Sequence, residues 1–325
     1  MLHYKSLLPL SLIAIILLLT VMFSSGPLPQ DKIITIPNNI TGATLADTLV
    51  AEQVISNKYI FLIFTKLFGK SKAFIKGDFL IEKHKSLIGV LFFITSSKNI
   101  YYYRITLIEG YNKRQMKTLL ESDPILAGDI TADMQEGSML PDTYLFTRGE
   151  TRDSIIFRSQ KKMQDFLDDL WENRDPTLPY KNKEEALTLA SIVEEESAIK
   201  DERDLIAGLF LNRLKTGMRI QSDPTVAYGL GRDSAGGLTH EDLLTPTPYN
   251  TYTVHALPIG PISNPSRESL RAVFFPKITN YLYFVADGKG GHIFATSLQE
   301  HNANVAKWRT IENIMKSEQN NQVIP

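Results

Sequence analysis

The sequence predicts an α+β protein with an N-terminal transmembrane helix, a small α+β module and a mainly helical larger domain that carries a short β-hairpin. Three observations support this fold class. No charged residue occurs from Ser6 to Gln30, short strand and helix patterns alternate up to about residue 108, and helical periodicity dominates from Tyr111 onward. The predicted parts are a cytoplasmic stub (1–5), a transmembrane helix (6–25), the small module (26–104), the larger domain (105–316) and a polar tail (317–325).

Composition excludes several functional classes. The 325 residues suggest about two domains, and a net charge of −1 argues against a nucleic-acid-binding protein. The absence of cysteine excludes disulfides, thiolate metal sites and cysteine nucleophiles. The six histidines show no HxH or HxxxH spacing, and no GxSxG motif occurs, so we expect no metal site and no cofactor.

The N-terminal apolar segment has two interpretations. Leu10–Phe23 is almost wholly apolar, and Lys5 before it favours a cytoplasmic N-terminus with the rest of the chain exported. The small residues at 24–26 would suit a cleaved signal peptide. The bulky Met22 and Phe23 spoil the small-x-small cleavage pattern, so we expect an uncleaved anchor.

The small module begins after a Gly- and Pro-containing linker at 26–31. Apolar patterns predict strands at 32–36, 77–83 and 99–108 and helices at 44–54 and 57–68. Thr44 and Asp47 resemble a capping box. The run 86–95 (SLIGVLFFIT) is compatible with a helix or a buried strand and is too short to span a membrane.

The larger domain is predicted to be mostly helical. The expected helices are 112–121, 151–171, 183–199, 201–215, 266–274 and about 297–316. Asp201 is the expected N-cap of the fourth, which stops at Gly217, and Ser297 with Glu300 forms a capping box. The sequence GKGG joins strands 281–287 and 292–296 as a hairpin. The loop 231–265 is long enough to suggest function.

Glu196 is the predicted general acid. Leu189, Ile192, Val193 and Glu196 fall at i, i+3, i+4 and i+7, so they share one helix face. Apolar surroundings disfavour the charged carboxylate and should raise its pKa, and a glutamic acid protonated near neutral pH can cleave a glycosidic bond. The competing interpretation is a solvated residue at a frayed helix end.

The neighbouring acids point elsewhere. Glu195 should face the polar side and Glu194 the small-residue side, so the three carboxylates cannot form a catalytic pair. Asp142 or Asp223 remains open as a second acid. Amide and aromatic side chains beyond this helix suit the hydroxyl rims and apolar faces of sugars. The candidates are Asn212, Gln221, Asp223, Tyr228, Asn250 and Tyr252.

Several motifs together resemble the endolytic murein transglycosylases of the YceG-like (MltG) family. They are LPDTYLF (140–146), LASIVEEES (189–197), ERDLIAGLFLNRLKTGMRIQSDPTVAYGLG (202–231), LTPTPYNTYT (244–253), LPIGPISNPS (257–266) and YLYFVADGKGGHIFATSLQEHN (281–302). The match spans about residues 105–310, which would make 105–316 a YceG-like catalytic domain. Residues 32–104 match only in outline, which implies a divergent LysM-like module at 26–104.

The resemblance implies a lyase that cuts peptidoglycan strands internally during cell wall assembly and remodelling. It would cleave the MurNAc–GlcNAc bond and leave 1,6-anhydroMurNAc ends. The family's V-E-x-E motif is Val193-Glu194-Glu195-Glu196 here, which places the catalytic role on Glu196. The third acid, Glu195, departs from the motif and makes Glu194 the main alternative. Five of the candidates would bind the sugar's acetamido groups, namely Asn212, Gln221, Tyr228, Asn250 and Tyr252, and Asp223 is a further substrate-binding candidate.

The implied location is the inner (cytoplasmic) membrane, with one span and the catalytic domain on the periplasmic side. Implied partners are peptidoglycan glycan strands and the membrane, with cell wall synthases as candidates and no nucleic acid. Two other functions stay open: a hydrolase of the same bond and a non-catalytic wall-binding scaffold.

Overall fold

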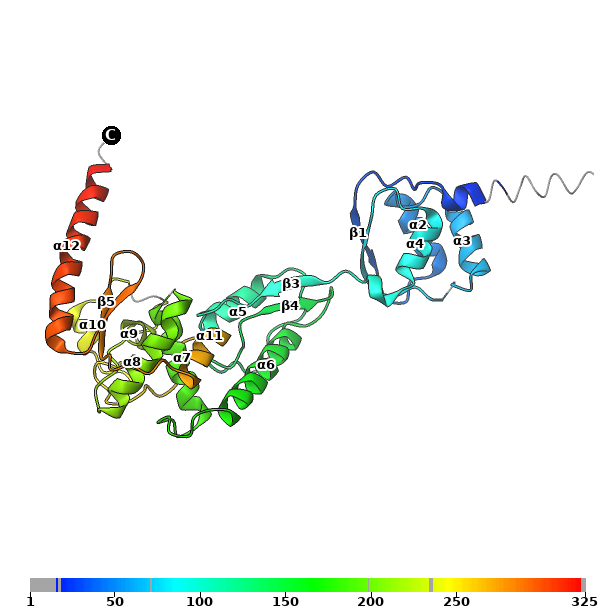
Figure 1. Cartoon of the computed structure of the whole chain (residues 1–325). Helices are drawn as coiled ribbons and strands as arrows, with labels where there is room; N and C mark the ends of the chain where they lie inside the picture. The colour runs from blue at the N-terminus through cyan, green and yellow to red at the C-terminus, as the bar shows by residue number, and fades with distance from the viewer. Residues whose placement is uncertain (1–15, 17–18, 71, 198, 234–235, 323–325) are drawn as a thin grey trace, which may run out of the picture. The chain divides into compact units, whose positions relative to one another are not determined.

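The computed structural model describes residue 16 and residues 19–70, 72–197, 199–233 and 236–322, with side chains as far as Thr310. The chain divides into two compact units (Figure 1). The N-unit runs to Arg104 and includes 125–127 and 145–150, and the C-unit contains the rest. Most of the predicted span 6–25 lies outside the described residues, and among those that are described no helix is long and apolar enough to cross a membrane.

From residue 32 to 99, apart from residue 71, the N-unit consists of a two-stranded sheet, three helices and a short turn. Strands β1 (Lys32–Ile36) and β2 (Gly77–Ile81) pair antiparallel, with Lys32 opposite Ile81. The helices are α2 (Gly42–Ala51), α3 (Lys58–Leu67) and α4 (Leu87–Ile94), and a short turn η1 (Ser97–Asn99) follows. Their apolar faces form one core that contains Ile34, Phe61 and Phe79.

Most expectations for this unit are confirmed. The strands at 32–36 and 77–83 and the two helices are present, and the undecided run 86–95 forms α4, capped by the Ser86 hydroxyl. The predicted capping box at Thr44 is wrong. Helix α2 begins earlier, and Thr41 Oγ accepts the Thr44 N–H (3.1 Å), so Thr44 lies inside the first turn. The third strand, β3 (Tyr103–Thr106), is shorter than predicted.

The C-unit is mainly helical, as predicted. Its helices and turns are α5 (Lys113–Ser122), α6 (Arg152–Glu172), α7 (Lys183–Glu196), η2 (Lys200–Glu202), α8 (Arg203–Lys215), α9 (Asp223–Gly229), α10 (His240–Leu244), α11 (Arg267–Phe274) and α12 (Leu298–Gln322). Strands β5 (Tyr283–Ala286) and β6 (His292–Ala295) form the predicted hairpin. The sequence did not reveal β4 (Thr143–Phe146), the partner of β3.

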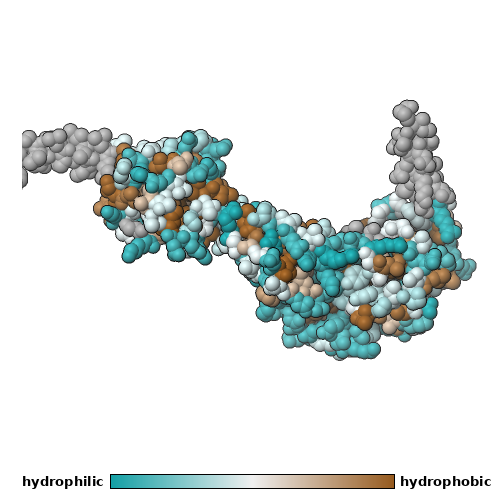
Figure 2. Space-filling view, turned by 180° about the vertical axis from the view of Figure 1, so that it is seen from behind, coloured by the Kyte–Doolittle hydropathy of each residue, from teal (hydrophilic) through white to brown (hydrophobic). Residues whose placement is uncertain are grey.

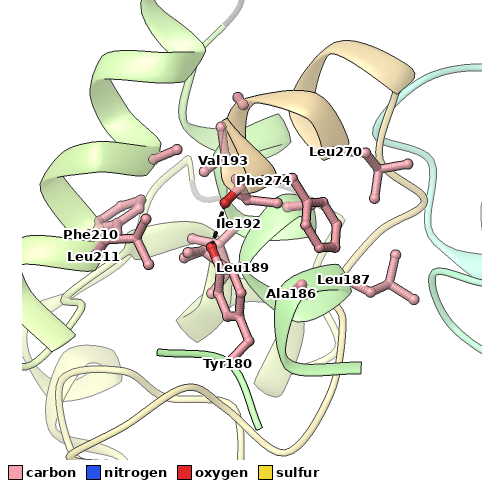
Figure 3. Packing of buried hydrophobic residues seen from close by; sticks show 14 of the residues in the cluster. Tyr180, Ala186, Leu187, Leu189, Ile192, Val193, Phe210, Leu211, Leu270 and Phe274 are labelled. Carbon is pink, nitrogen blue, oxygen red and sulfur yellow. Dashed lines mark hydrogen bonds between the residues drawn. The ribbon is translucent and has the colours of Figure 1, made fainter. Parts of the chain in front are cut away.

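Helix α7 is the centre of this unit. Asn182 caps its first turn, and every residue from Ala186 to Glu194 is buried. Figure 3 shows Leu189, Ile192 and Val193 surrounded by side chains from α8 and α11. The Tyr180 hydroxyl donates to the Val273 carbonyl (2.9 Å) at the edge of this core. The core therefore fixes the orientation of α7.

Two boundaries near this helix differ from the sequence prediction. Helix α7 ends at Glu196, three residues before the predicted end at residue 199, because Ser197 adopts an extended backbone (φ −138°, ψ 124°). The prediction that Asp201 is the N-cap of α8 is wrong. Asp201 lies within η2, and Glu202 occupies the cap position without a side-chain cap hydrogen bond. The Glu202 carboxylate is instead engaged by His292.

A close helix–loop approach yields a stability prediction. A Cβ at Gly208 in α8 would lie 2.2 Å from the Lys277 carbonyl oxygen. The backbone of Lys277 is itself held in place, because its N–H donates to the Asp204 carbonyl (3.1 Å). Backbone cannot move aside as a flexible side chain can. We expect Gly208→Ala to lower the free energy of unfolding by about 1–3 kcal/mol or more, measured by urea denaturation.

Gly42→Ala is the matched control for this experiment. At Gly42 the nearest atoms to a new Cβ are side-chain carbons at 3.5 and 3.7 Å, which is ordinary contact. An alanine there restricts the unfolded chain and should be neutral or stabilising by up to about 1 kcal/mol. Equal midpoints for the two variants would contradict the close packing of α8 against Lys277.

Candidate active site

Three consecutive carboxylates end helix α7. Glu194, Glu195 and Glu196 lie where the unpaired carbonyls of the last turn disfavour negative charge. Successive residues on a helix are rotated by about 100°, so the three side chains leave α7 in different directions. Each carboxylate therefore has a separate environment and needs a separate account.

Glu194 is held in a buried ion pair. Its Oε1 accepts from Arg203 Nη2 (2.8 Å), and its Oε2 accepts from the backbone N–H (2.9 Å) and hydroxyl (2.6 Å) of Ser266. Arg203 Nη1 also donates to the Ser266 hydroxyl (2.7 Å). Both oxygens of Glu194 are occupied, so this residue joins α7 to α8 and to the start of α11.

Glu196 lines an open cavity of about 410 Å³. The cavity combines charged, amide and aromatic side chains, which is the composition expected of a sugar site. Its other lining residues are Arg213, Gln221, Asp223, Tyr252, Tyr283, Phe284, Leu298 and His301. Glu196 is the last residue of α7, as the interpretation of a frayed helix end required. Its side chain is nevertheless half-buried and lies in a cavity.

Burial raises the pKa of Glu196 to about 7. The Ser222 hydroxyl opposes this rise in pKa, and the negative charge of Asp223 adds to it. The raised pKa predicted from the apolar helix face is therefore confirmed. Near neutral pH a substantial fraction of Glu196 carries the proton that a general acid must donate.

Glu195 faces two other cavities. One, of about 260 Å³, also contains Tyr228 and Asn112, and the other, of about 780 Å³, contains Asp142 and Arg267. Burial first, and then the charges of the neighbouring acids, raises the pKa of Glu195 to about 7 as well. Two adjacent acids thus titrate in the same range but serve different cavities.

The structure brings three of the six predicted binding residues to Glu196. Gln221 adopts a left-handed backbone (φ 53°), which is unusual for a residue with a side chain and directs the amide from a constrained loop. The Tyr252 hydroxyl donates to Asp223 Oδ1 (2.6 Å). Thr251 binds the backbone of this loop through the Ser222 N–H (2.9 Å), so the three side chains share one rigid frame.

The other three have structural partners. The Asn250 side chain has no exposed area, and its amide donates to the carbonyls of Leu243 and Thr245. The Asn212 amide donates to the carbonyls of Thr279 and Tyr281. Substrate contact by these two asparagines stays a prediction, and their hydrogen bonds indicate that they position loops.

Tyr228 lies in the cavity of Glu195. Its hydroxyl donates to Glu136 Oε2 (2.8 Å), and its ring meets that of Tyr249 at 4.7 Å. Burial raises the pKa of Glu136 above its usual value. This cavity is distinct from that of Glu196, so a role for Tyr228 in substrate binding also stays a prediction.

Several residues of the site were not among the six predicted binding residues. Arg213 is buried, donates to the Leu282 carbonyl (2.7 Å) and lies 5.7 Å from the Tyr283 ring centre. The His301 ring stacks on the Tyr283 ring, with ring centres 5.2 Å apart. The alternation of strand β5 marked Tyr283 as a strand residue, but nothing in it indicated which side chains meet Glu196.

A histidine and a glutamate brace this side of the site. His292 Nδ1 lies 2.7 Å from Glu202 Oε2, and the His292 N–H donates to Glu202 Oε1 (3.0 Å). A Cβ at Gly291 would lie 2.8 Å from the same carboxylate, which explains a glycine there. The contact fixes the β5–β6 hairpin to the start of α8.

The two candidates for a second acid lie in different cavities. Asp223 shares the cavity of Glu196, whereas Asp142 lies in the 780 Å³ cavity and pairs with Lys162 (2.8 Å). In the part of the chain that the structure describes, no group of three or more His, Asp or Glu side chains could hold a metal ion.

Comparisons with known proteins place this arrangement in context. An endolytic murein transglycosylase of Bacillus subtilis is 30% identical over 313 residues, which cover 86% of this chain and 85% of that protein. One from Streptococcus pneumoniae is 34% identical over 197 residues, covering 58% of this chain and 35% of that protein. A solved structure of a YceG-like protein from Listeria monocytogenes matches 85% of this chain and 99% of its own, at 26% identity and a TM-score of 0.52.

The family model agrees with these relatives. The model described as the YceG-like family matches residues 34–307, which include the whole of α7 and every residue around Glu196 named above. The chain belongs to the YceG-like family.

Proposed function

We propose that this protein is an endolytic peptidoglycan lytic transglycosylase, a lyase that cleaves the MurNAc–GlcNAc bond and leaves 1,6-anhydroMurNAc ends. The observation that carries the proposal is Glu196, an acid with a pKa of about 7 in an open cavity beside Asp223, Tyr252 and Tyr283. The relatives named as endolytic murein transglycosylases support the same substrate class.

The reaction needs one carboxyl group. Protonated Glu196 donates its proton to the glycosidic oxygen, and the bond from that oxygen to C1 of MurNAc breaks. C1 gains oxocarbenium character, assisted by the sugar's own N-acetyl group. The C6 hydroxyl then attacks C1, and the Glu196 carboxylate takes its proton, so no water is consumed. One residue acts as acid and then as base.

Neighbouring side chains have roles that follow from their positions. Gln221, Asp223 and Tyr252 would bind the polar rim of a sugar, and Tyr283 with Phe284 would cover an apolar face. The charge of Asp223 favours the protonated form of Glu196 before the reaction. It would also stabilise the positive charge that develops at C1.

The location and the smaller unit belong to the same proposal. Residues 6–25 would form a single-pass anchor in the inner membrane, with the catalytic domain 105–316 on the periplasmic side and peptidoglycan strands as its substrate. The uncharged stretch from Ser6 to Gln30 supports the anchor. Residues 26–104 would be a divergent LysM-like module, and cell wall synthases are candidate partners.

Glu196→Gln tests the assignment of the acid. The amide keeps the shape of the side chain and removes the titrating proton, so we expect anhydro-ended products to fall by about 10²–10⁴-fold without unfolding. Mass spectrometry of digested sacculi measures these products. Glu195→Gln is the matched control, because it removes an adjacent acid of similar pKa from a different cavity.

The possible outcomes separate the alternatives. A loss of products in Glu195→Gln, but not in Glu196→Gln, would move the catalytic role to the middle acid. Products with reducing ends would identify a hydrolase of the same bond. Sacculus binding by a wild-type protein that yields no products would identify a wall-binding scaffold.

The activity should fall as the pH rises through about 7. The folded-state pKa of Glu196 is raised, so the proton is present below that pH and is lost above it. Well above pH 7, kcat/KM should fall about tenfold per pH unit. The profile should be measured in wild type and in Glu195→Gln, which must keep an inflection, moved only to a lower pH by the loss of the neighbouring Glu195 charge, if Glu196 controls it.

Glu194→Gln should destabilise the fold instead. Removing one charge leaves Arg203 buried and uncompensated, at a cost of about 3–5 kcal/mol in the free energy of unfolding. Urea denaturation checks this, and Glu196→Gln serves as the control that should retain stability. A stable but inactive Glu194→Gln variant would contradict the structural role of this residue.

A further inference from the structure

Helix α3 of the N-unit exposes an apolar stripe. Tyr59, Ile63 and Leu67 follow one another at i, i+4 and i+8, and their exposed fractions are 68%, 52% and 67%. Phe61 and Phe64 of the same helix are buried in the core. The helix is therefore apolar on its outer face as well as its inner face, which solvent contact alone does not explain.

The stripe continues onto the neighbouring helix. Phe68 at the end of α3 meets Phe92 of α4 edge-on, with ring centres 5.4 Å apart, and both are exposed. Hydrophobic side chains are visible on the surface of this unit in Figure 2, with hydrophilic ones between them. We call Tyr59, Ile63, Leu67, Phe68 and Phe92 the α3 patch.

Lysines lie within helix α3 and in the segment that follows it. Lys66 lies within α3, Lys70, Lys72 and Lys76 follow it, and Lys70 Nζ lies 5.7 Å from the Phe92 ring centre. From residue 26 to 104 the sequence has ten basic and five acidic residues, although the whole chain has a net charge of −1. An apolar patch with Lys66 and Lys70 beside it matches an anionic lipid surface, where lysines meet phosphates and aromatic rings enter the interface.

The end of the predicted anchor and the linker after it pack into this unit. Met22, near the end of the predicted span 6–25, and Leu28 in the linker are both buried in the N-unit core. The Gly26 N–H donates to the His84 carbonyl (3.1 Å), and a Cβ at Gly26 would lie 2.2 Å from the Lys85 carbonyl oxygen. The linker is thus packed into the unit, which holds the unit close to the end of the apolar segment.

From these observations we propose that the α3 patch docks on the surface of an anionic lipid bilayer. The inference rests on the proposed anchor at residues 6–25. It adds a second membrane contact, in which Ile63 and Leu67 enter the interface and Lys66 and Lys70 bind lipid phosphates. Two contacts would fix the orientation of the N-unit on the membrane, which one span alone would not do.

Spin labelling of the full-length protein tests the docking. The chain has no cysteine, so one introduced cysteine gives one label. The reporters are Ile63→Cys and, one turn later, Leu67→Cys, with the protein reconstituted in phosphatidylcholine vesicles that contain phosphatidylglycerol. Power saturation with oxygen, which enters lipid, and with a water-soluble nickel chelate compares the two environments of each label.

Two control positions separate the proposals. Thr35→Cys lies on the exposed side of β1, which Figure 1 shows on the other side of this unit from α3, and its label should remain aqueous. Leu19→Cys lies in the predicted anchor, and its label should be in lipid. We expect the Ile63 and Leu67 labels to gain oxygen accessibility and to lose nickel accessibility, less so after Lys66→Glu with Lys70→Glu.

Three other outcomes are possible, and each would disprove either the docking of the α3 patch on lipid or the anchor on which it rests. A Leu19 label in lipid with aqueous Ile63 and Leu67 labels would disprove the docking and leave the anchor intact. An aqueous Leu19 label would disprove the anchor and this inference with it. Ile63 and Leu67 labels shielded from both reagents would show that protein covers the patch, as in a second copy of the chain.

Discussion

The buried contact of Glu194 with Arg203 and Ser266 is the constraint on which the active site depends. It joins the end of α7 to α8 and to the first turn of α11, and both carboxylate oxygens have donors. Burying charges is costly, and this geometry offsets the cost because each charge is paired and hydrogen-bonded. Once Glu194 is fixed, the helix rotation fixes the directions of Glu195 and Glu196.

The same helix end gives neighbouring acids different chemistry. Glu194 has a cationic partner, whereas Glu195 and Glu196 have burial and negative neighbours, and their pKa values rise to about 7. What separates the last two is the surroundings of each cavity. Glu195 faces Glu136 and Asp142, while Glu196 faces Asp223, Tyr252 and the aromatic residues of β5. The proposed reaction uses the latter set, in which the charge of Asp223 would stabilise positive charge that develops at C1 of a sugar.

Local patterns in the sequence predicted much of this arrangement, and long-range contacts explain the rest. The apolar periodicity predicted α7, and the GKGG sequence predicted the hairpin. Asn250 and Gln221 look alike as loop amides, yet Asn250 is buried because the Leu243 and Thr245 carbonyls need its amide. The Glu202–His292 contact spans 90 residues, so no local pattern could reveal that it takes Glu202 away from helix capping.

The proposed reaction requires one acid to serve two steps. A single carboxyl must be protonated when the substrate binds and basic after the bond breaks, so its pKa must lie near the working pH. A fully buried acid would not return to the charged state, and a solvated one would not hold the proton. Glu196 lies between these limits, half-buried at a helix end, with Asp223 favouring the proton and the Ser222 hydroxyl favouring its release. The Thr251 hydroxyl accepts the Ser222 N–H (2.9 Å) and so helps to hold the segment that carries Ser222 and Asp223.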